Sequence, residues 1–166
     1  MADNRHFVDD ARTAAGRQIL AMMDEVGFDA YAAGWIHDGP TNTWRYILST
    51  PMLKSKGPIW IYDHLLRMFR FRPLPDGVSP LDVFVIDPDY ELALFGDLAV
   101  GSQYVSQNNP MHHIDVVAFS QDMVFPGFAV TDGFVVFYRK LAQSDRNRRR
   151  DPVRTFDHKI RQLEAA

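Results

Sequence analysis

Three carboxylates stand at alternate positions directly after an apolar run, in the stretch FVIDPDYELALFG at residues 84–96. They are Asp87, Asp89 and Glu91. Hard cations such as Mg²⁺ prefer carboxylate oxygens, and the carboxyl edge of a sheet is a natural crevice for a ligand. One interpretation of this stretch is therefore a divalent-metal site that acts on a phosphate-containing substrate.

The same residues also have the types that begin a helix. Aspartate is a good N-cap at position 87, Pro88 is a preferred first helical residue, and Asp89 suits the positive end of the helix dipole. The Gly-Thr turn of haloacid-type phosphatases and the Gly-Ser loop of nucleotidyltransferases are both missing. We favour the cap, which accounts for these residues without a ligand, and expect a short helix over 88–95.

A second candidate for metal binding is the stretch HHID at residues 112–115. If a strand begins here, His113 and Asp115 face the same way and could share a metal ion with a distant ligand. No His-Glu-x-x-His spacing supports this reading. We favour a half-exposed polar histidine and expect no cofactor. The alternative hypothesis is an enzyme that uses Mg²⁺ or Mn²⁺ at Asp87, Asp89 and Glu91, with His113 and Asp115.

Arginines cluster near the C-terminus in the stretch RNRRRD. Candidate binding residues are Arg146, Arg148, Arg149 and Arg150. Guanidinium groups pair with phosphates and carboxylates, and binding to nucleic acid through them would depend on salt. Interspersed aspartates and the absence of an RNA-recognition signature weaken the case for nucleic acid. Docking on an acidic protein or on the chain's own surface, and a simple solvated face, are the alternatives.

Charge is unevenly distributed along the 166 residues. Residues 1–138 hold 9 Lys/Arg and 17 Asp/Glu, a net charge of −8, whereas residues 139–166 hold 9 and 4, a net charge of +5. No nucleophile elbow, Gly-rich dinucleotide motif or P-loop occurs. We therefore expect a non-enzymatic binding module whose basic tail recognises an acidic protein or a nucleic acid.

Hydrophobic periodicity predicts the elements that would position these residues. They are a helix over 7–26 that Gly27 can end, a hairpin over 30–50, a helix over 54–71, and strands over 81–87, 113–120 and 133–140, the last two separated by a turn around Pro126 and Gly127. Pro58 stands where the second helix can begin, and Ile61, Leu65 and Met68 form an apolar stripe on it. Residues 97–111 show no period and are predicted to be a loop. This order favours an α+β fold. We expect a mostly antiparallel sheet of about five strands, with helices packed on one face and a basic C-terminal extension.

One domain is expected over residues 1–140, followed by a basic tail over 141–166 that contains a short amphipathic helix. Phe156, Ile160 and Leu163 lie at helical spacing, so this helix either folds back on the body or pairs with a second copy in a homodimer. The chain has no cysteine, no signal-peptide pattern and no long apolar run. We expect a bacterial-type cytoplasmic protein without a membrane partner.

Overall fold

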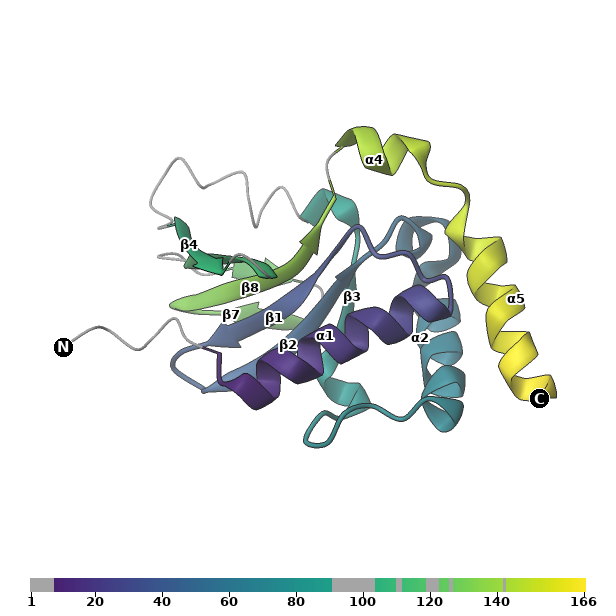
Figure 1. Cartoon of the computed structure of the whole chain (residues 1–166), viewed down its shortest axis with the longest axis horizontal. Helices are drawn as coiled ribbons and strands as arrows, with labels where there is room; N and C mark the ends of the chain where they lie inside the picture. Colours follow the sequence, from purple (N-terminus) through teal and green to yellow (C-terminus); the bar gives the residue numbers. More distant parts are fainter. Residues whose placement is uncertain (1–7, 91–103, 110–111, 119–122, 126, 142) are drawn as a thin grey trace.

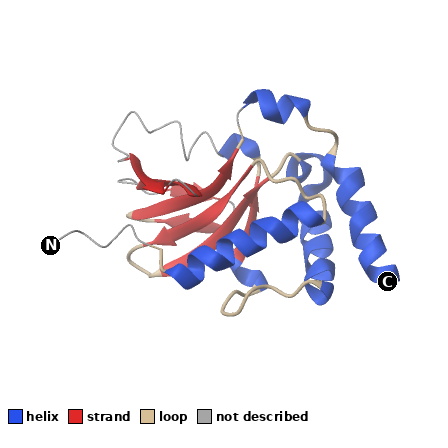
Figure 2. Ribbon diagram, in the orientation of Figure 1, coloured by secondary structure: helices blue, strands red, loops and turns tan. Residues whose placement is uncertain are grey.

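The fold is α+β, with a central sheet between a helical layer and a small second sheet (Figure 1). The computed structural model describes residues 8–90, 104–109, 112–118, 123–125, 127–141 and 143–166. For residues 104–109 and 112–118 it describes the backbone alone. Figure 2 shows the helices gathered on one side of the strands. Among the described residues, no helix is long and apolar enough to cross a membrane.

The main sheet is mixed, which corrects the expectation of a mostly antiparallel one. Its strands are β1 (Ala32–Asp38), β2 (Thr43–Ser49), β3 (Val83–Ile86), β4 (Tyr104–Asn109), β5 (His112–Ala118) and β8 (Gly133–Lys140), in the order β3-β2-β1-β8-β5-β4. Strand β3 runs parallel to β2, because the chain crosses back through a helix between them. The other neighbours are antiparallel.

The number and position of the strands also differ from the expectation. The four strands β3, β2, β1 and β8 form a mixed sheet, and β5 and β4 extend it to six, compared with about five expected. Strand β4 lies within residues that were predicted to be a loop. That prediction was wrong because its sequence, YVSQNN, carries too few apolar residues to show a period of two.

Helix α1 (Asp10–Glu25) has both of its ends specified by local sequence. The side chain of Asp9 accepts a hydrogen bond from the backbone N–H of Arg12 at 2.7 Å, so it caps the first turn. Gly27 has a φ of 71°, and the N–H of Phe28 bonds back to the carbonyl of Met23 at 3.0 Å. This is the left-handed ending that the sequence predicts for a glycine at this position.

The predicted hairpin is present as β1 and β2, and several of its residues are buried in the main core. Trp35 lies directly opposite Tyr46, with ring centroids 4.9 Å apart. The hydroxyl of Tyr46 donates to the carbonyl of Gly16 in α1 at 2.7 Å, which satisfies its polar atom inside the core. The hairpin therefore binds α1 through both apolar contact and a buried hydrogen bond.

The opposite face of the sheet is covered by a second hairpin, β6 (Met123–Phe125) and β7 (Phe128–Val130). Phe125 and Val130 are buried there against Ile36 and Val135. Side chains alternate between faces along a strand, so the neighbouring β1 residues Trp35 and Ile36 are buried in the cores on opposite faces of the sheet. The sequence predicts only a turn in this region, and three-residue strands are too short for periodicity to reveal.

Helix α2 (Met52–Phe71) is interrupted at Gly57, whose φ is 79°. Pro58 follows directly, so it begins the second part of the helix, as predicted. Ile61, Leu65 and Met68 are buried and face the sheet, in agreement with the predicted stripe. This part of α2 presents one apolar face to the core and one polar face to the C-terminal helix.

The tail contains helices α4 (Gln143–Arg148) and α5 (Pro152–Ala165). Phe156 and Ile160 of α5 are fully buried in the core that α1 and α2 share, and Leu163 packs against it. The rings of Phe156 and Phe28 are nearly perpendicular, with their centroids 5.3 Å apart. Of the two expected uses of this apolar stripe, the structure shows the fold-back on the body.

Candidate functional site

The acidic run at residues 87–91 begins a helix, in the manner that the cap interpretation predicts. The carboxylate of Asp87 accepts a hydrogen bond from the backbone N–H of Asp89 at 2.9 Å, and residues 88–90 are helical. Asp89 is exposed and pairs with Lys54 at 3.3 Å. Glu91 and the remainder of the predicted helix lie outside the described residues. One carboxylate of the run is thus a cap and another is in an ion pair at the surface.

The second acidic candidate lies on a different part of the sheet. His113 and Asp115 are on β5, opposite Asn108 and Ser106 of β4, and the structure describes only their backbone. Three strands separate β5 from β3, whose end leads to Asp87. At ~4.8 Å per strand, the two strands are ~19 Å apart across the sheet. The topology therefore does not bring the two candidate groups together.

Within the part of the chain that the structure describes, no three His, Asp or Glu side chains are grouped so that they could hold a metal ion.

The four candidate arginines divide into two kinds. Arg146 donates from Nε to the carbonyl of Leu141 at 3.0 Å and lies 4.8 Å from the ring centroid of Tyr31, and Arg149 pairs with Asp29. In contrast, Arg148 and Arg150 are exposed, and their guanidinium groups have no ion pair with any residue that the structure describes. Half of the cluster is therefore docked on the body and half is available to a ligand.

Beside this cluster, the ends of α1, β8 and α5 surround a pocket of about 360 Å³. Its charged lining residues are Asp24, Asp29, Arg139, Arg149 and Arg150, and we call it the arginine pocket. Arg139 makes two parallel hydrogen bonds to Asp24, each of 2.6 Å, which fixes its guanidinium plane. The pocket thus combines two arginines that are paired with carboxylates and one, Arg150, that has no ion pair with a described residue.

The backbone after α1 creates this pocket. Gly27 and Asp29 both have positive φ, at 71° and 56°, and turn the chain sharply away from the helix. A Cβ atom on Gly27 would lie 2.5 Å from Cγ2 of Thr155, so only glycine lets α1 approach α5 this closely. Because Thr155 also lines the pocket, the position of α5 determines its shape.

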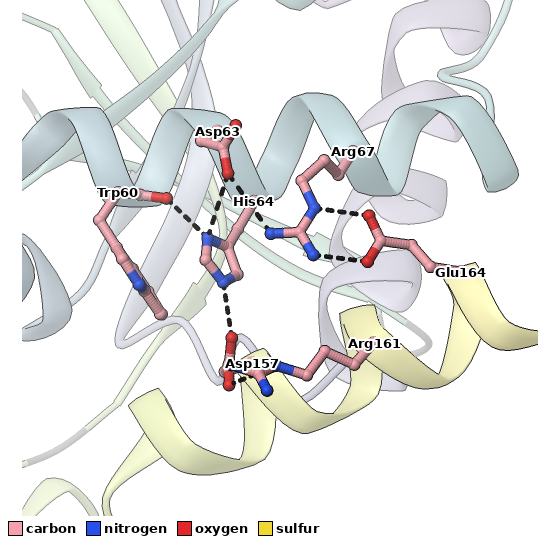
Figure 3. Close-up of polar contacts among 7 residues, drawn as sticks. All are labelled: Trp60, Asp63, His64, Arg67, Asp157, Arg161 and Glu164. Carbon is pink, nitrogen blue, oxygen red and sulfur yellow. Dashed lines mark hydrogen bonds and ion pairs between the residues drawn. The ribbon is translucent and has the colours of Figure 1, made fainter.

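His64 holds α5 against α2 (Figure 3). Its side chain is 5% exposed. Its Nδ1 lies 2.8 Å from the carbonyl oxygen of Trp60, and its Nε2 lies 2.9 Å from Oδ1 of Asp157 on α5. A carbonyl and a carboxylate only accept hydrogen bonds, so both ring nitrogens face acceptors. This arrangement suits a histidine that carries a proton on each nitrogen.

A second contact joins the same two helices near the end of α5. Arg67 donates from Nε and one terminal nitrogen to the two oxygens of Glu164, at 2.6 and 2.5 Å (Figure 3). Hydrogen bonds from Arg67 lower the pKa of Glu164, and the hydrogen bond to His64 lowers the pKa of Asp157. Two polar contacts about two turns of α5 apart therefore fix this helix, and with it one wall of the arginine pocket.

Sequence reasoning missed most of the residues that build this site. Arg139, Asp24, His64 and Asp157 have no motif around them. One signal was present, because His64 lies within the apolar stripe of Ile61 and the other buried residues of α2. A titratable residue at a core position of an amphipathic helix needs a polar partner, although its identity cannot be read from the sequence.

Comparison of the chain with models of protein families, with curated proteins and with solved structures gives no match. The functional conclusions below therefore depend on the geometry and charge of the described residues.

Proposed function

We propose that this protein is a non-enzymatic binding module that recognises an acidic protein partner through its basic C-terminal segment. The proposal depends on one observation, which is the exposure and the lack of described ion pairs of Arg148 and Arg150. Both are exposed and have no ion pair with a described residue, whereas Arg146 and Arg149 beside them are engaged by the body. The body thus holds the segment in place while two guanidinium groups remain available.

The charge around these arginines favours a protein partner over a nucleic acid. Asp145 and Asp151 flank the two available guanidinium groups, and residues 1–138 carry a net charge of −8. A nucleic acid needs a series of phosphate contacts, each of which releases counterions, and two arginines supply few of them. An acidic protein segment can present a few carboxylates at chosen positions, which suits a small basic surface between acidic neighbours.

Fluorescence anisotropy with a labelled glutamate-rich peptide and with short DNA and RNA, at low salt, tests this proposal. We expect the peptide to bind, and a variant with both Arg148→Gln and Arg150→Gln to bind it about tenfold more weakly, which is about 1.4 kcal/mol. Arg154→Gln is the matched control, because Arg154 is an exposed arginine of α5 that does not line the arginine pocket.

Each alternative outcome of this experiment has a clear meaning. Binding of the oligonucleotides but not of the peptide, lost in the double variant, would replace the protein partner with a nucleic acid. Equal binding of the peptide by the double variant and the Arg154 control would refute the role of the two arginines. No binding of either probe to the wild-type chain would refute the proposed function.

A further inference from the structure

We infer that the arginine pocket is a binding site for one phosphate group of a small polar molecule. The pocket overlaps the exposed surface proposed above for the acidic partner at Arg150, whereas Arg148 belongs to that surface alone and the remaining lining residues to the pocket alone. Small-molecule binding in the pocket would therefore be an additional property of the protein.

The charges that line the pocket leave one positive charge without a counterpart. Arg139 is paired with Asp24, and Arg149 is paired with Asp29. Arg150 also lines the pocket and pairs with no described residue. Three guanidinium groups against two carboxylates fit a single bound anion. They fit an extended polyanion poorly, because the two aspartates would repel it.

The two paired arginines are held in place for an oxyanion. A guanidinium group has five N–H donors, and Asp24 occupies two of those on Arg139. The side chains of Arg139 and Arg149 are only 22% and 30% exposed, so their remaining donors act in a less polar environment than water. Hydrogen bonds from charged donors to an oxyanion are stronger there, and the fork of an arginine matches the geometry of a phosphate.

The size and lining of the pocket limit what else the ligand contains. A volume of about 360 Å³ is at the small end of the range for ligand sites, roughly 300–1,000 Å³. The uncharged residues that the structure describes in the lining are Gly27, Pro152 and Thr155, and none of the described lining residues is aromatic. A nucleobase or an acyl chain would find no apolar wall on which to pack. The ligand is therefore a compact phosphomonoester of a polar molecule.

Two substitutions should change phosphate affinity in opposite directions. Arg150→Gln removes the unpaired charge, and we expect it to weaken binding about tenfold. Asp29→Asn releases Arg149 for the ligand, and we expect it to strengthen binding several-fold. Asparagine suits this position because it tolerates the positive φ of 56° that Asp29 adopts. Arg154→Gln is again the control outside the pocket, and thermal melting confirms that each variant is folded.

The measurement is a calorimetric titration with inorganic phosphate and with glycerol phosphate. A parallel titration with acetate tests whether a carboxylate binds as well as a phosphate. We expect both phosphates to bind in competition with each other, and acetate to bind more weakly. No heat from either phosphate, or equal affinity in the Arg150 and Arg154 variants, would overturn the inference. Acetate binding as tightly as phosphate would overturn the assignment of the ligand class.

Failure of this inference and failure of the proposed function are distinguishable. Phosphate binding without peptide binding would support the pocket and refute the acidic partner. Peptide binding without phosphate binding would refute the pocket and leave the partner in place.

Discussion

The contact between His64 and Asp157 gives a sharp test of how the C-terminal helix is held. A neutral imidazole has one N–H group, whereas the ring of His64 faces oxygen acceptors at 2.8 and 2.9 Å. Either neutral tautomer would leave a nitrogen lone pair against an oxygen. The geometry therefore predicts that the contact with Asp157 is stronger when the ring is charged and is weakened when the ring is neutral.

The other charged groups near the ring of His64 either favour its charged form or are already paired with a group of opposite charge. From its own helix, Asp63 lies 3.9 Å from Nδ1 of His64. From α5, Arg161 contacts the outer oxygen of Asp157 at 3.1 Å. The ring also stacks on Trp60 at a centroid distance of 3.9 Å, which favours a charged imidazole through a cation–π contact. Arg67 and Glu164 nearby compensate each other through their two hydrogen bonds.

A double-mutant cycle with His64→Ala and Asp157→Ala measures the coupling energy of the pair. Hydrogen bonds to charged groups contribute ~1.5–3 kcal/mol. Since Asp157 is 29% exposed, solvent screening moves the expected value to the lower part of that range, about 2 kcal/mol. With a neutral ring we expect less than ~1 kcal/mol.

The cycle should be measured by urea unfolding near pH 5.5 and near pH 9. The hydrogen bond to His64 lowers the pKa of Asp157, so this carboxyl is charged at both values. Its own contribution is present above about pH 4 and is lost only at lower pH. A coupling energy that falls as the pH rises therefore belongs to the ring.

The same coupling energy at both pH values would refute the charged histidine, and a value near zero at pH 5.5 would refute the contact itself. His158→Ala is the matched control, because His158 is an exposed histidine on the same helix. Its substitution should leave the coupling between His64 and Asp157 unchanged.

Two further predictions concern stability and metal ions. Phe156 is fully buried between α5, α2 and the end of α1, so Phe156→Ala should lower the free energy of unfolding in urea by ~3–5 kcal/mol. Thr155→Ala, at the exposed neighbouring position, should lower it much less. A loss below ~1 kcal/mol for Phe156→Ala would contradict docking of α5 on the body. Asp87→Ala should cost ~1 kcal/mol by removing the helix cap, and the wild-type melting temperature should be the same with and without Mg²⁺ or Mn²⁺. An upward shift with metal that Asp87→Ala abolishes would instead establish the metal site.

Local rules explain the parts of the structure that were predicted correctly. Gly27 ends α1, Pro58 begins the main part of α2, and Asp87 caps the turn after β3, because each depends on residues within about four positions along the chain. The alternating pattern of Trp44, Tyr46 and their neighbours likewise shows β2 directly, since one face of that strand packs on the helices. The α+β class followed from the order of these elements.

Sequence alone thus determined where most helices and strands lie, which residues end them, and that positive charge gathers near the C-terminus. Tertiary structure decided the parallel direction of β3, the partners of each charge, and the existence of the arginine pocket. His64 meets Asp157 across 93 positions, and Arg139 meets Asp24 across 115. Such contacts leave no periodic trace in the sequence, because they depend on how the packed elements place two distant side chains. In addition, the sequence offers several oppositely charged partners for each of these residues.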